Sequence, residues 1–278
     1  MKDNFWRRYN GVIIPWEPPH VNFELSQRQV VEDISSNHAL LARWTTNFDS
    51  KIASPFWYII NDQVVKFQDY SRNTKSKIKR GFKKLNVKII DKTDLLKDGY
   101  SVYIKAIKRY SVVLNKKSYS DFKNEIENLD SSWEIWGVYC NLNNQLVAYS
   151  LNRNSDDYCD YSTIKFDPLF LKDYSSYVLY YSMNKYYLEE KKIKYVSNGT
   201  RSISHQTNIH DFLIEKFMFR KAYCKIELVY KRKINILIKF LYPYRLIFSL
   251  IPINLFRKIY IILFQEEIKR KCQKVYKN

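Results

Sequence analysis

The stretch that decides the fold runs from Gly199 to Tyr230 and has the sequence GTRSISHQTNIHDFLIEKFMFRKAYCKIELVY. A β-type run leads into it through Asn198-Gly199, a dipeptide typical of turns. Apolar residues then recur at helical spacing, namely Ile209, Phe212, Leu213 and Phe217. From Cys224 to Tyr230 apolar and polar residues alternate, as they do in a half-buried strand. The predicted order is therefore strand, turn, short helix, strand.

This order resembles the end of the GNAT acyltransferase domain, in which a helix closes with a motif like Y-E-K-x-G-F before the last strand. Glu215, Lys216 and Phe219 match the motif. Ile214 replaces the tyrosine that often donates a proton, and Met218 replaces the glycine. The phrase GTRS at 199–202 is similar to the Fem-type branch, which transfers aminoacyl or acyl groups in envelope building. The resemblance implies a GNAT-like α/β fold with a mixed, mostly antiparallel sheet flanked by helices.

Length and composition are those of a folded protein with a sizeable core. The 278 residues include 24 tyrosines and only 5 glycines, and such aromatic richness argues against disorder. The four cysteines are far apart and form no C-x-x-C pair, so we expect reduced, buried or half-buried thiols and no metal site. Because nothing at the N-terminus resembles a signal peptide, a cytoplasmic location is expected.

Three parts are expected: an N-terminal extension over residues 1–84, a GNAT-like domain over 85–230 and a basic tail over 231–278. The extension ends in a predicted basic helix between Tyr70 and Lys84, which is either a solvated surface or a face for an acidic substrate or cofactor phosphates. In the domain, predicted strands at 133–140, 145–153 and 158–166 precede a helix at 175–190. That is the GNAT order up to the cofactor site.

The loop before that helix has the sequence DPLFLKDYSS, residues 167–176. In GNAT proteins the matching loop is rich in glycine, and its amides and the helix N-terminus hold the pyrophosphate of coenzyme A. The resemblance gives the cofactor-binding role to Lys172, Asp173, Ser175 and Ser176. Since the loop lacks glycine, its backbone approaches a phosphate less closely, which favours the Fem-type branch, whose members often take an aminoacyl-tRNA.

Acyl transfer needs a group that accepts the proton of the attacking nucleophile. His205, shortly after the turn, is one candidate base, and the strand acids Glu134 and Asp160 are the others. Thr200 and Arg201 are candidates for binding the acceptor, with Arg201 suited to a carboxylate or phosphate. Each of these side chains also has an ordinary structural explanation as a loop or strand residue.

The net charge of +19 is unevenly distributed. The 48 residues from Lys231 contain 12 Lys and Arg but only Glu266 and Glu267 as acids. The segment 234–264 is apolar, is interrupted by Pro243 and Pro252, and is edged by cations. It is too interrupted for a membrane span of about 20 residues and is typical of a helix lying on an anionic bilayer. Packing on the domain is the alternative.

The sequence thus predicts an acyltransferase that moves an acyl group from acetyl-coenzyme A or another acyl-coenzyme A to an amine or hydroxyl of a cell-envelope or glycan precursor. An acidic or phosphorylated acceptor, peripheral attachment to the inner face of the membrane and no specific nucleic acid are expected. The alternatives are an aminoacyl-tRNA-dependent transferase and an inactive acyltransferase-fold adaptor that binds membrane or nucleic acid.

Overall fold

The computed structural model describes residues 5–9, 11–108, 116–203, 208–251 and 253–277. The chain forms two compact units, each taken by itself below. Unit 1 comprises Met1–Tyr58, Thr200–Thr207 and Lys221–Asn278, and unit 2 comprises Ile59–Gly199 and Asn208–Arg220. The chain passes from one unit to the other within β4 (Phe56–Asn61) and near the ends of β9 and β10.

Unit 2 is built on a sheet whose strands follow the order β9-β8-β7-β6-β5. The four strands from β5 to β8 are antiparallel to their neighbours, whereas β9 runs parallel to β8. Their bounds are β5 (Leu85–Ile90), β6 (Trp133–Cys140), β7 (Leu146–Ser155), β8 (Tyr158–Phe166) and β9 (Tyr195–Thr200). The three expected central strands are therefore confirmed.

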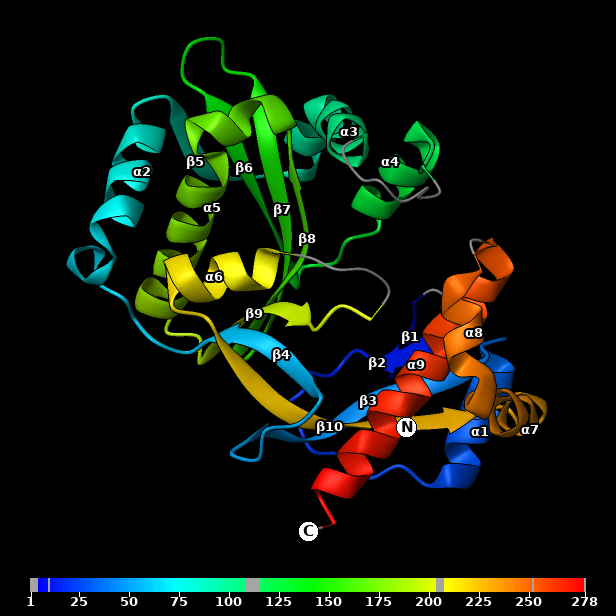
Figure 1. The fold of residues 1–278 in the computed structure, drawn as a ribbon. Helices are drawn as coiled ribbons and strands as arrows, with labels where there is room; N and C mark the ends of the chain where they lie inside the picture. Colours follow the sequence, from blue (N-terminus) through cyan, green and yellow to red (C-terminus); the bar gives the residue numbers. More distant parts are fainter. Residues whose placement is uncertain (1–4, 10, 109–115, 204–207, 252, 278) are drawn as a thin grey trace. The chain divides into compact units, whose positions relative to one another are not determined.

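Helices cover both faces of this sheet (Figure 1). On one face α3 (Lys92–Ile107) and α4 (Tyr119–Glu127) pack through an apolar cluster that includes Leu95, Val102 and Phe122. On the other face lies α5 (Ser175–Asn184), which continues as the π-helix η3 (Lys185–Glu190). The helices α2 (Arg72–Phe82) and α6 (Ile209–Phe217) pack against α5.

Capping side chains in the sequence fix where several of these helices begin. Ser71 accepts a hydrogen bond from the Thr74 amide at the start of α2, and Asp91 does the same from Asp94 at the start of α3. Ser118 forms a full capping box at the start of α4. Each cap satisfies an amide that has no partner within its own helix, an effect worth about 1 kcal/mol.

Unit 1 has its own strands, in the order β1-β2-β3-β10. They are β1 (Trp6–Tyr9), β2 (Val12–Pro15), β3 (Leu41–Ser50) and β10 (Arg220–Tyr230). The β2–β3 pair is parallel and the other two pairs are antiparallel. The helix α1 (Gln27–Ser36) buries Val30 and Ile34 against one face of the strands.

The C-terminal segment forms α7 (Arg232–Leu241), the 3-10 helix η4 (Tyr242–Tyr244), α8 (Arg245–Leu250) and α9 (Asn254–Val275). These helices are not merely a surface tail, because Ile238 of α7 and Leu263, Ile268 and Cys272 of α9 join the buried core of unit 1. Packing on the domain, the alternative left open by the sequence, is thus correct for this part of the segment. None of the described helices is long and apolar enough to cross a bilayer.

The decisive stretch folds as predicted, with β9, α6 and β10 in that order. Its helix ends at Met218, which has a φ of 58° and so takes the left-handed conformation that glycine normally supplies at a helix C-terminus. Methionine therefore ends the helix in this conformation with added backbone strain.

The predicted fold class is confirmed: the chain is mixed α/β, with mostly antiparallel strands flanked by helices and a C-terminal helix. The expected boundaries at 84/85 and 230/231 do not coincide with the two compact units. The predicted basic helix, α2, belongs to unit 2, while most of β10 and the whole C-terminal segment belong to unit 1.

A first prediction concerns the contact between α2 and α5. A Cβ atom at Gly81 would lie 2.5 Å from Cγ1 of Val178, a fully buried side chain. Overpacking of this kind costs about 1–3 kcal/mol, which exceeds or offsets the gain in helix propensity of about 1 kcal/mol. We expect Gly81→Ala to lower the free energy of unfolding and Val178→Ala to relieve the clash. The double variant should be less destabilised than the sum of the two single variants in urea denaturation.

Ser76→Ala is the matched control for these single and double variants, since Ser76 is exposed on the same helix. It should leave the free energy of unfolding unchanged or slightly raised. Additive effects of Gly81→Ala and Val178→Ala would contradict the predicted close contact.

Candidate functional site

The pairing of β8 with β9 is short. Three residue pairs join the strands, and the last is Asp160 with Ser197. β8 continues to Phe166 along β7, so among the described residues its outer half is paired on one side only. In the described part of the chain, the two parallel strands are no longer paired beyond Asp160 and Ser197.

The hydroxyl of Tyr187 joins η3 to the sheet. It accepts hydrogen bonds from Trp136 Nε1 at 2.9 Å and Asn152 Nδ2 at 3.3 Å, and it donates to Glu134 Oε2 at 2.6 Å. One donor and two acceptor sites are all that a hydroxyl offers, so this group is fully used. Burial, together with the bond to Glu134, raises the pKa of Tyr187 and keeps the hydroxyl protonated.

Further buried hydrogen bonds extend from this centre along the same face. Ser150 Oγ donates to Asn152 Oδ1 at 2.5 Å, and Tyr161 donates to Asn184 Oδ1 at 2.9 Å. Tyr180 of α5 donates to Asn198 Oδ1 of β9 at 3.0 Å. α5 is therefore fixed to the sheet by specific polar contacts as well as by apolar packing.

Glu134 is half-buried, and its oxygens are occupied. Besides Tyr187, Lys191 Nζ donates to Oε1 at 2.5 Å and Tyr186 donates to the same oxygen at 3.4 Å. Burial alone would raise the pKa of Glu134, but hydrogen bonds from Lys191, Tyr187 and Asn154 outweigh it and hold the pKa below its ordinary value. A carboxylate with these partners is a poor proton acceptor, so its position favours a structural role over the expected role of base.

Asp160 does not share a cleft with Glu134. Residues opposite each other in an antiparallel pair point to the same face. Glu134 is opposite Asn152, which is opposite Tyr161, whereas Asp160 is opposite Arg153. Since Tyr161 and Asp160 are consecutive residues of β8, they face opposite sides of the sheet. At most one of these two candidate bases can therefore face a given cleft.

The loop expected to bind the cofactor forms the 3-10 helix η2 (Pro168–Asp173) and is held at both ends. At its start the buried Asp167 is paired with Lys105 of α3 at 2.8 Å. At its end Asp173 is paired with Lys84, just after α2. Tyr174 follows with a φ of 67°, so a left-handed turn precedes α5 although the loop contains no glycine.

The four expected cofactor residues have different surroundings. Lys172 is exposed, and Ser176 is half-buried in the first turn of α5. Ser175 is fully buried, and its hydroxyl has no hydrogen-bond partner among the described residues. Asp173 is engaged by Lys84, and as an anion it would repel a phosphate. Ser176 and Lys172 are thus the two of the four that are suited to an anionic ligand.

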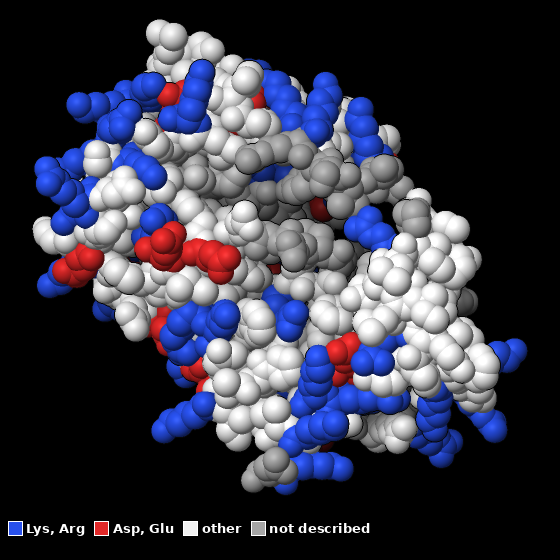
Figure 2. Space-filling model, in the orientation of Figure 1, with Lys and Arg blue, Asp and Glu red and all other residues white. Residues whose placement is uncertain are grey.

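The basic helix α2 lies along the start of α5 (Figure 1). Lys77 Nζ is 3.2 Å from the hydroxyl of Tyr177, and the Arg80 guanidinium lies 4.9 Å from the ring centre of Tyr174. With Lys84 on Asp173, three cations surround the first turn of α5. Figure 2 shows a dense group of Lys and Arg over α2. The sequence predicted the helix but not this placement.

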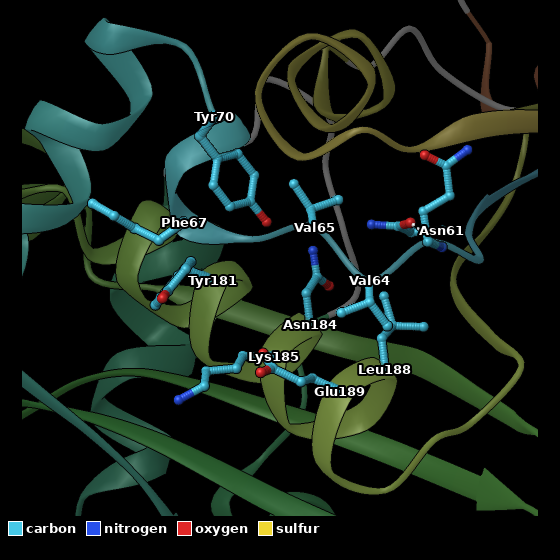
Figure 3. A pocket seen from close by; sticks show the side chains of 11 residues that line it. Asn61, Val64, Val65, Phe67, Tyr70, Tyr181, Asn184, Lys185, Leu188 and Glu189 are labelled. Carbon is cyan, nitrogen blue, oxygen red and sulfur yellow. Dashed lines mark hydrogen bonds between the residues drawn. The ribbon is translucent and has the colours of Figure 1, made fainter.

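A small polar pocket lies beside α5 (Figure 3). Its lining includes Asn61, Tyr70 and Asn184, and burial raises the pKa of Tyr70. The accessible space is only about 20 Å³, enough for about one water molecule. This pocket is too small for an acyl donor or acceptor.

The acceptor candidates lie in unit 1, where Thr200 ends β9 and Arg201 follows. The Arg201 guanidinium lies over the rings of Trp57 at 4.7 Å and Phe264 at 5.7 Å, and it donates to the Pro55 carbonyl at 2.6 Å. Burial lowers its pKa. Among the described residues no carboxylate acts on the Arg201 charge, and its Nε is buried without a partner. His205, the first candidate base, lies outside the described residues.

Sequence reasoning missed the residues that build this face of the sheet, above all Tyr187, Asn152 and Asn184. Polar residues within apolar strands and helices were the available signal, since buried polar groups need partners. Most of their partners are distant in sequence, as Tyr161 is from Asn184 and Glu134 is from Tyr187, so spacing did not reveal them. Among the described residues, no group of His, Cys, Asp or Glu is arranged to hold a metal ion.

Comparison with solved structures identifies the fold. FemX matches with a TM-score of 0.58 at 10% identity, over 84% of this chain and 85% of FemX. The chain has a GNAT-like, Fem-type fold. The C-terminal domain of a protein assigned as a lysylphosphatidylglycerol synthetase, from Agrobacterium fabrum, matches with a TM-score of 0.52 at 10% identity, over 85% of this chain and 82% of that domain. No family model and no curated protein matches the sequence.

The state of Glu134 gives a second prediction. Because its pKa in the folded protein is lowered, the carboxylate stabilises the fold above its ordinary pKa of about 4.3, and this contribution is lost as the pH falls through the folded pKa. Glu134→Gln should lower the melting temperature at pH 7. The difference from wild type should shrink as the pH falls toward and below the lowered pKa.

Glu189→Gln is the matched control, because Glu189 is exposed on the same π-helix. Its melting temperature should follow that of wild type across the whole pH range. If the difference in melting temperature between Glu134→Gln and wild type is independent of pH, the charge of Glu134 contributes nothing to stability.

Proposed function

We propose that this chain is an acyltransferase that moves an acyl group from an acyl-coenzyme A donor to an amine or hydroxyl of a cell-envelope or glycan precursor. The observation that carries the proposal is the set of cations around the first turn of α5. Lys77, Arg80 and Lys84 surround this turn, and it follows a strand whose parallel neighbour diverges. The resemblance to GNAT proteins, in which the start of the corresponding helix holds the pyrophosphate of coenzyme A, supports this turn as the donor side.

The physical fit to a pyrophosphate has two parts. The first amides of an α-helix have no partners within the helix, and the helix dipole adds positive potential there. The half-buried Ser176 supplies a hydroxyl at this turn, and the cations of α2 supply charge. Since η2 is held by Asp167–Lys105 and Asp173–Lys84, binding needs little ordering of this loop.

On the acceptor side we propose that Arg201, with Thr200 beside it, binds a carboxylate or phosphate of the precursor. The contacts with Trp57 and Phe264 hold the guanidinium in place. The proton of the nucleophile then needs a base other than Glu134, whose oxygens are engaged. We retain His205 for this role.

The donor proposal predicts a specific thermal shift. Acetyl-coenzyme A at about 100 times its dissociation constant should stabilise the protein by about 2.7 kcal/mol, visible as a higher melting temperature. Ser176→Asp places a negative charge where the helix dipole favours it, so the free protein should stay folded. The same charge repels the pyrophosphate and should abolish the shift.

Ser182→Asp is the charge-matched control, since Ser182 is half-buried near the other end of α5. It should keep the coenzyme A shift. Ser175 is unsuitable for this test because it is fully buried, and a carboxylate there would destabilise the fold itself. No shift with wild type at millimolar coenzyme A would rule out this donor.

A second donor, aminoacyl-tRNA, is favoured by the extent of the basic surface. Residues 72–84 contain seven Lys and Arg and no acid. Arg72, Lys79 and Lys83 are exposed, in addition to the cations that contact α5. A compact cofactor does not need so extended a surface, whereas a nucleic acid backbone does.

Binding of tRNA, followed by fluorescence anisotropy across a salt series, distinguishes the two donors. If tRNA is the donor, log Kd should depend steeply on log salt concentration. The Lys79→Gln/Lys83→Gln variant should weaken binding and lower that slope by about 2. The control Lys97→Gln/Lys116→Gln, also at exposed positions, should bind as wild type does. Equal effects of both pairs would mean that tRNA responds to the net charge of the protein and not to a binding surface on α2.

A further inference from the structure

The outer side of the C-terminal helices is apolar. Nine large side chains of α7, η4, α8 and the start of α9 are exposed, with accessibilities from 47% for Leu237 to 80% for Leu250. We call this set the apolar face: Ile236, Leu237, Phe240, Tyr244, Leu246, Ile247, Leu250, Ile253 and Leu255. Figure 2 shows the surface over α8 largely free of charged side chains.

The apolar face belongs to a folded layer. α7 exposes Phe240 while it buries Ile238, and α8 packs through Phe248, whose ring stacks on Phe256 of α9 at 5.6 Å. Phe240 and Tyr244 have ring centres 6.4 Å apart, which joins α7 to η4. Nine exposed apolar side chains within twenty residues are far more than a soluble surface usually gathers in one place, and such patches mark interaction sites.

A basic groove adjoins the apolar face at the start of α8. It has a volume of about 510 Å³. We call it the basic groove, and its lining is Tyr242, Arg245, Glu267, Arg270, Lys271, Gln273, Lys274 and Lys277. Arg270 and Arg245 lie over the ring of Tyr242 at 3.7 Å and 4.6 Å, so an aromatic ring orders two guanidinium groups at its wall.

The two acids of the C-terminal segment are already neutralised. Glu267 pairs with Arg245 at 2.9 Å and Lys271 at 2.6 Å, and Glu266 pairs with Arg270 at 2.8 Å. Against these two acids residues 231–278 carry 12 Lys and Arg. Much of the excess positive charge lies on exposed side chains of the same segment, namely Arg232, Lys233, Lys239, Lys258, Lys274 and Lys277.

We propose that this part of unit 1 docks onto an anionic lipid bilayer. The apolar face enters the boundary between headgroups and acyl chains, the surrounding cations meet the headgroups, and the basic groove takes a lipid phosphate. Apolar burial and cationic attraction together are the two terms that hold interfacial helices on membranes. A second copy of the chain fits less well, since each copy would bring the same excess of positive charge. The docking does not depend on the proposed transfer chemistry.

The test uses the full chain, because the C-terminal helices contribute to the core and a truncated chain would lose Ile238, Leu263 and Ile268. Sedimentation with phosphatidylcholine vesicles, with or without phosphatidylglycerol, measures binding. Wild type should sediment with the anionic vesicles, and salt should weaken binding only in part, because apolar burial is not screened. The triple variant Leu246→Ser/Ile247→Ser/Leu250→Ser should lower the partition coefficient roughly 100-fold or more.

Two pairs of variants separate the contribution of apolar burial from that of electrostatic attraction. Leu142→Ser/Leu169→Ser removes apolar side chains that are 93% and 67% exposed in unit 2 and should leave binding unchanged. Lys274→Gln/Lys277→Gln should weaken binding roughly 10- to 30-fold at low salt, and the control Lys97→Gln/Lys116→Gln should not.

Three results would overturn the proposal. The first is failure of wild type to bind anionic vesicles, and the second is equal binding by the triple variant. The third is a concentration-dependent dimer in analytical ultracentrifugation that the triple variant abolishes while wild type does not bind vesicles, which would assign the apolar face to self-association. None of these results changes the coenzyme A shift, so a failed docking proposal and a failed donor proposal remain distinguishable.

Discussion

The hydroxyl of Tyr187 is the contact on which the architecture of unit 2 most depends. It lies on the π-helical continuation of α5 and uses all its hydrogen-bonding capacity on β6 and β7, through Trp136, Asn152 and Glu134. A buried network in which every group has a partner fixes one arrangement, because any slip leaves polar groups unsatisfied at a cost of about 1–3 kcal/mol each. The far end of α5 is thereby fixed, and its first turn is held where β8 and β9 separate.

That first turn is assembled from three separate parts of the chain. Lys105 of α3 and Lys84 after α2 fix the two ends of η2, and α2 adds Arg80 above Tyr174. Positive charge, helix amides and a fixed loop suit a phosphorylated ligand. They supply no proton acceptor, so the proposed transfer needs a base from elsewhere in the chain.

The C-terminal segment of unit 1 combines two roles that are usually separate. Its inward side chains, such as Ile238 and Leu263, belong to the core, while its outward side chains form the apolar face beside a basic groove. The inward side chains account for the packing of these helices on unit 1, so the outward apolar side chains need a different explanation. Among the described residues, Glu266 and Glu267 are neutralised within the segment, and exposed cations such as Lys274 and Lys277 can meet an anionic surface.

The sequence by itself determined the order of the central strands β6, β7 and β8 and of β9, α6 and β10, but not the strands β1 and β2 near the N-terminus. The 3.6-residue and two-residue periodicities around α6 and β10 reflect burial of one face, and side chains such as Ser71, Asp91 and Ser118 mark helix starts, because these signals act over a few residues. Tertiary structure alone decided that Glu134 and Asp160 face opposite sides of the sheet, since strand register depends on partners distant in the chain. It also decided that Tyr174 and Met218 take left-handed conformations that their sequence disfavours, because the surrounding packing outweighs the local strain. The division of the C-terminal helices into a core side and an exposed side was likewise set by what they pack against, which no local pattern encodes.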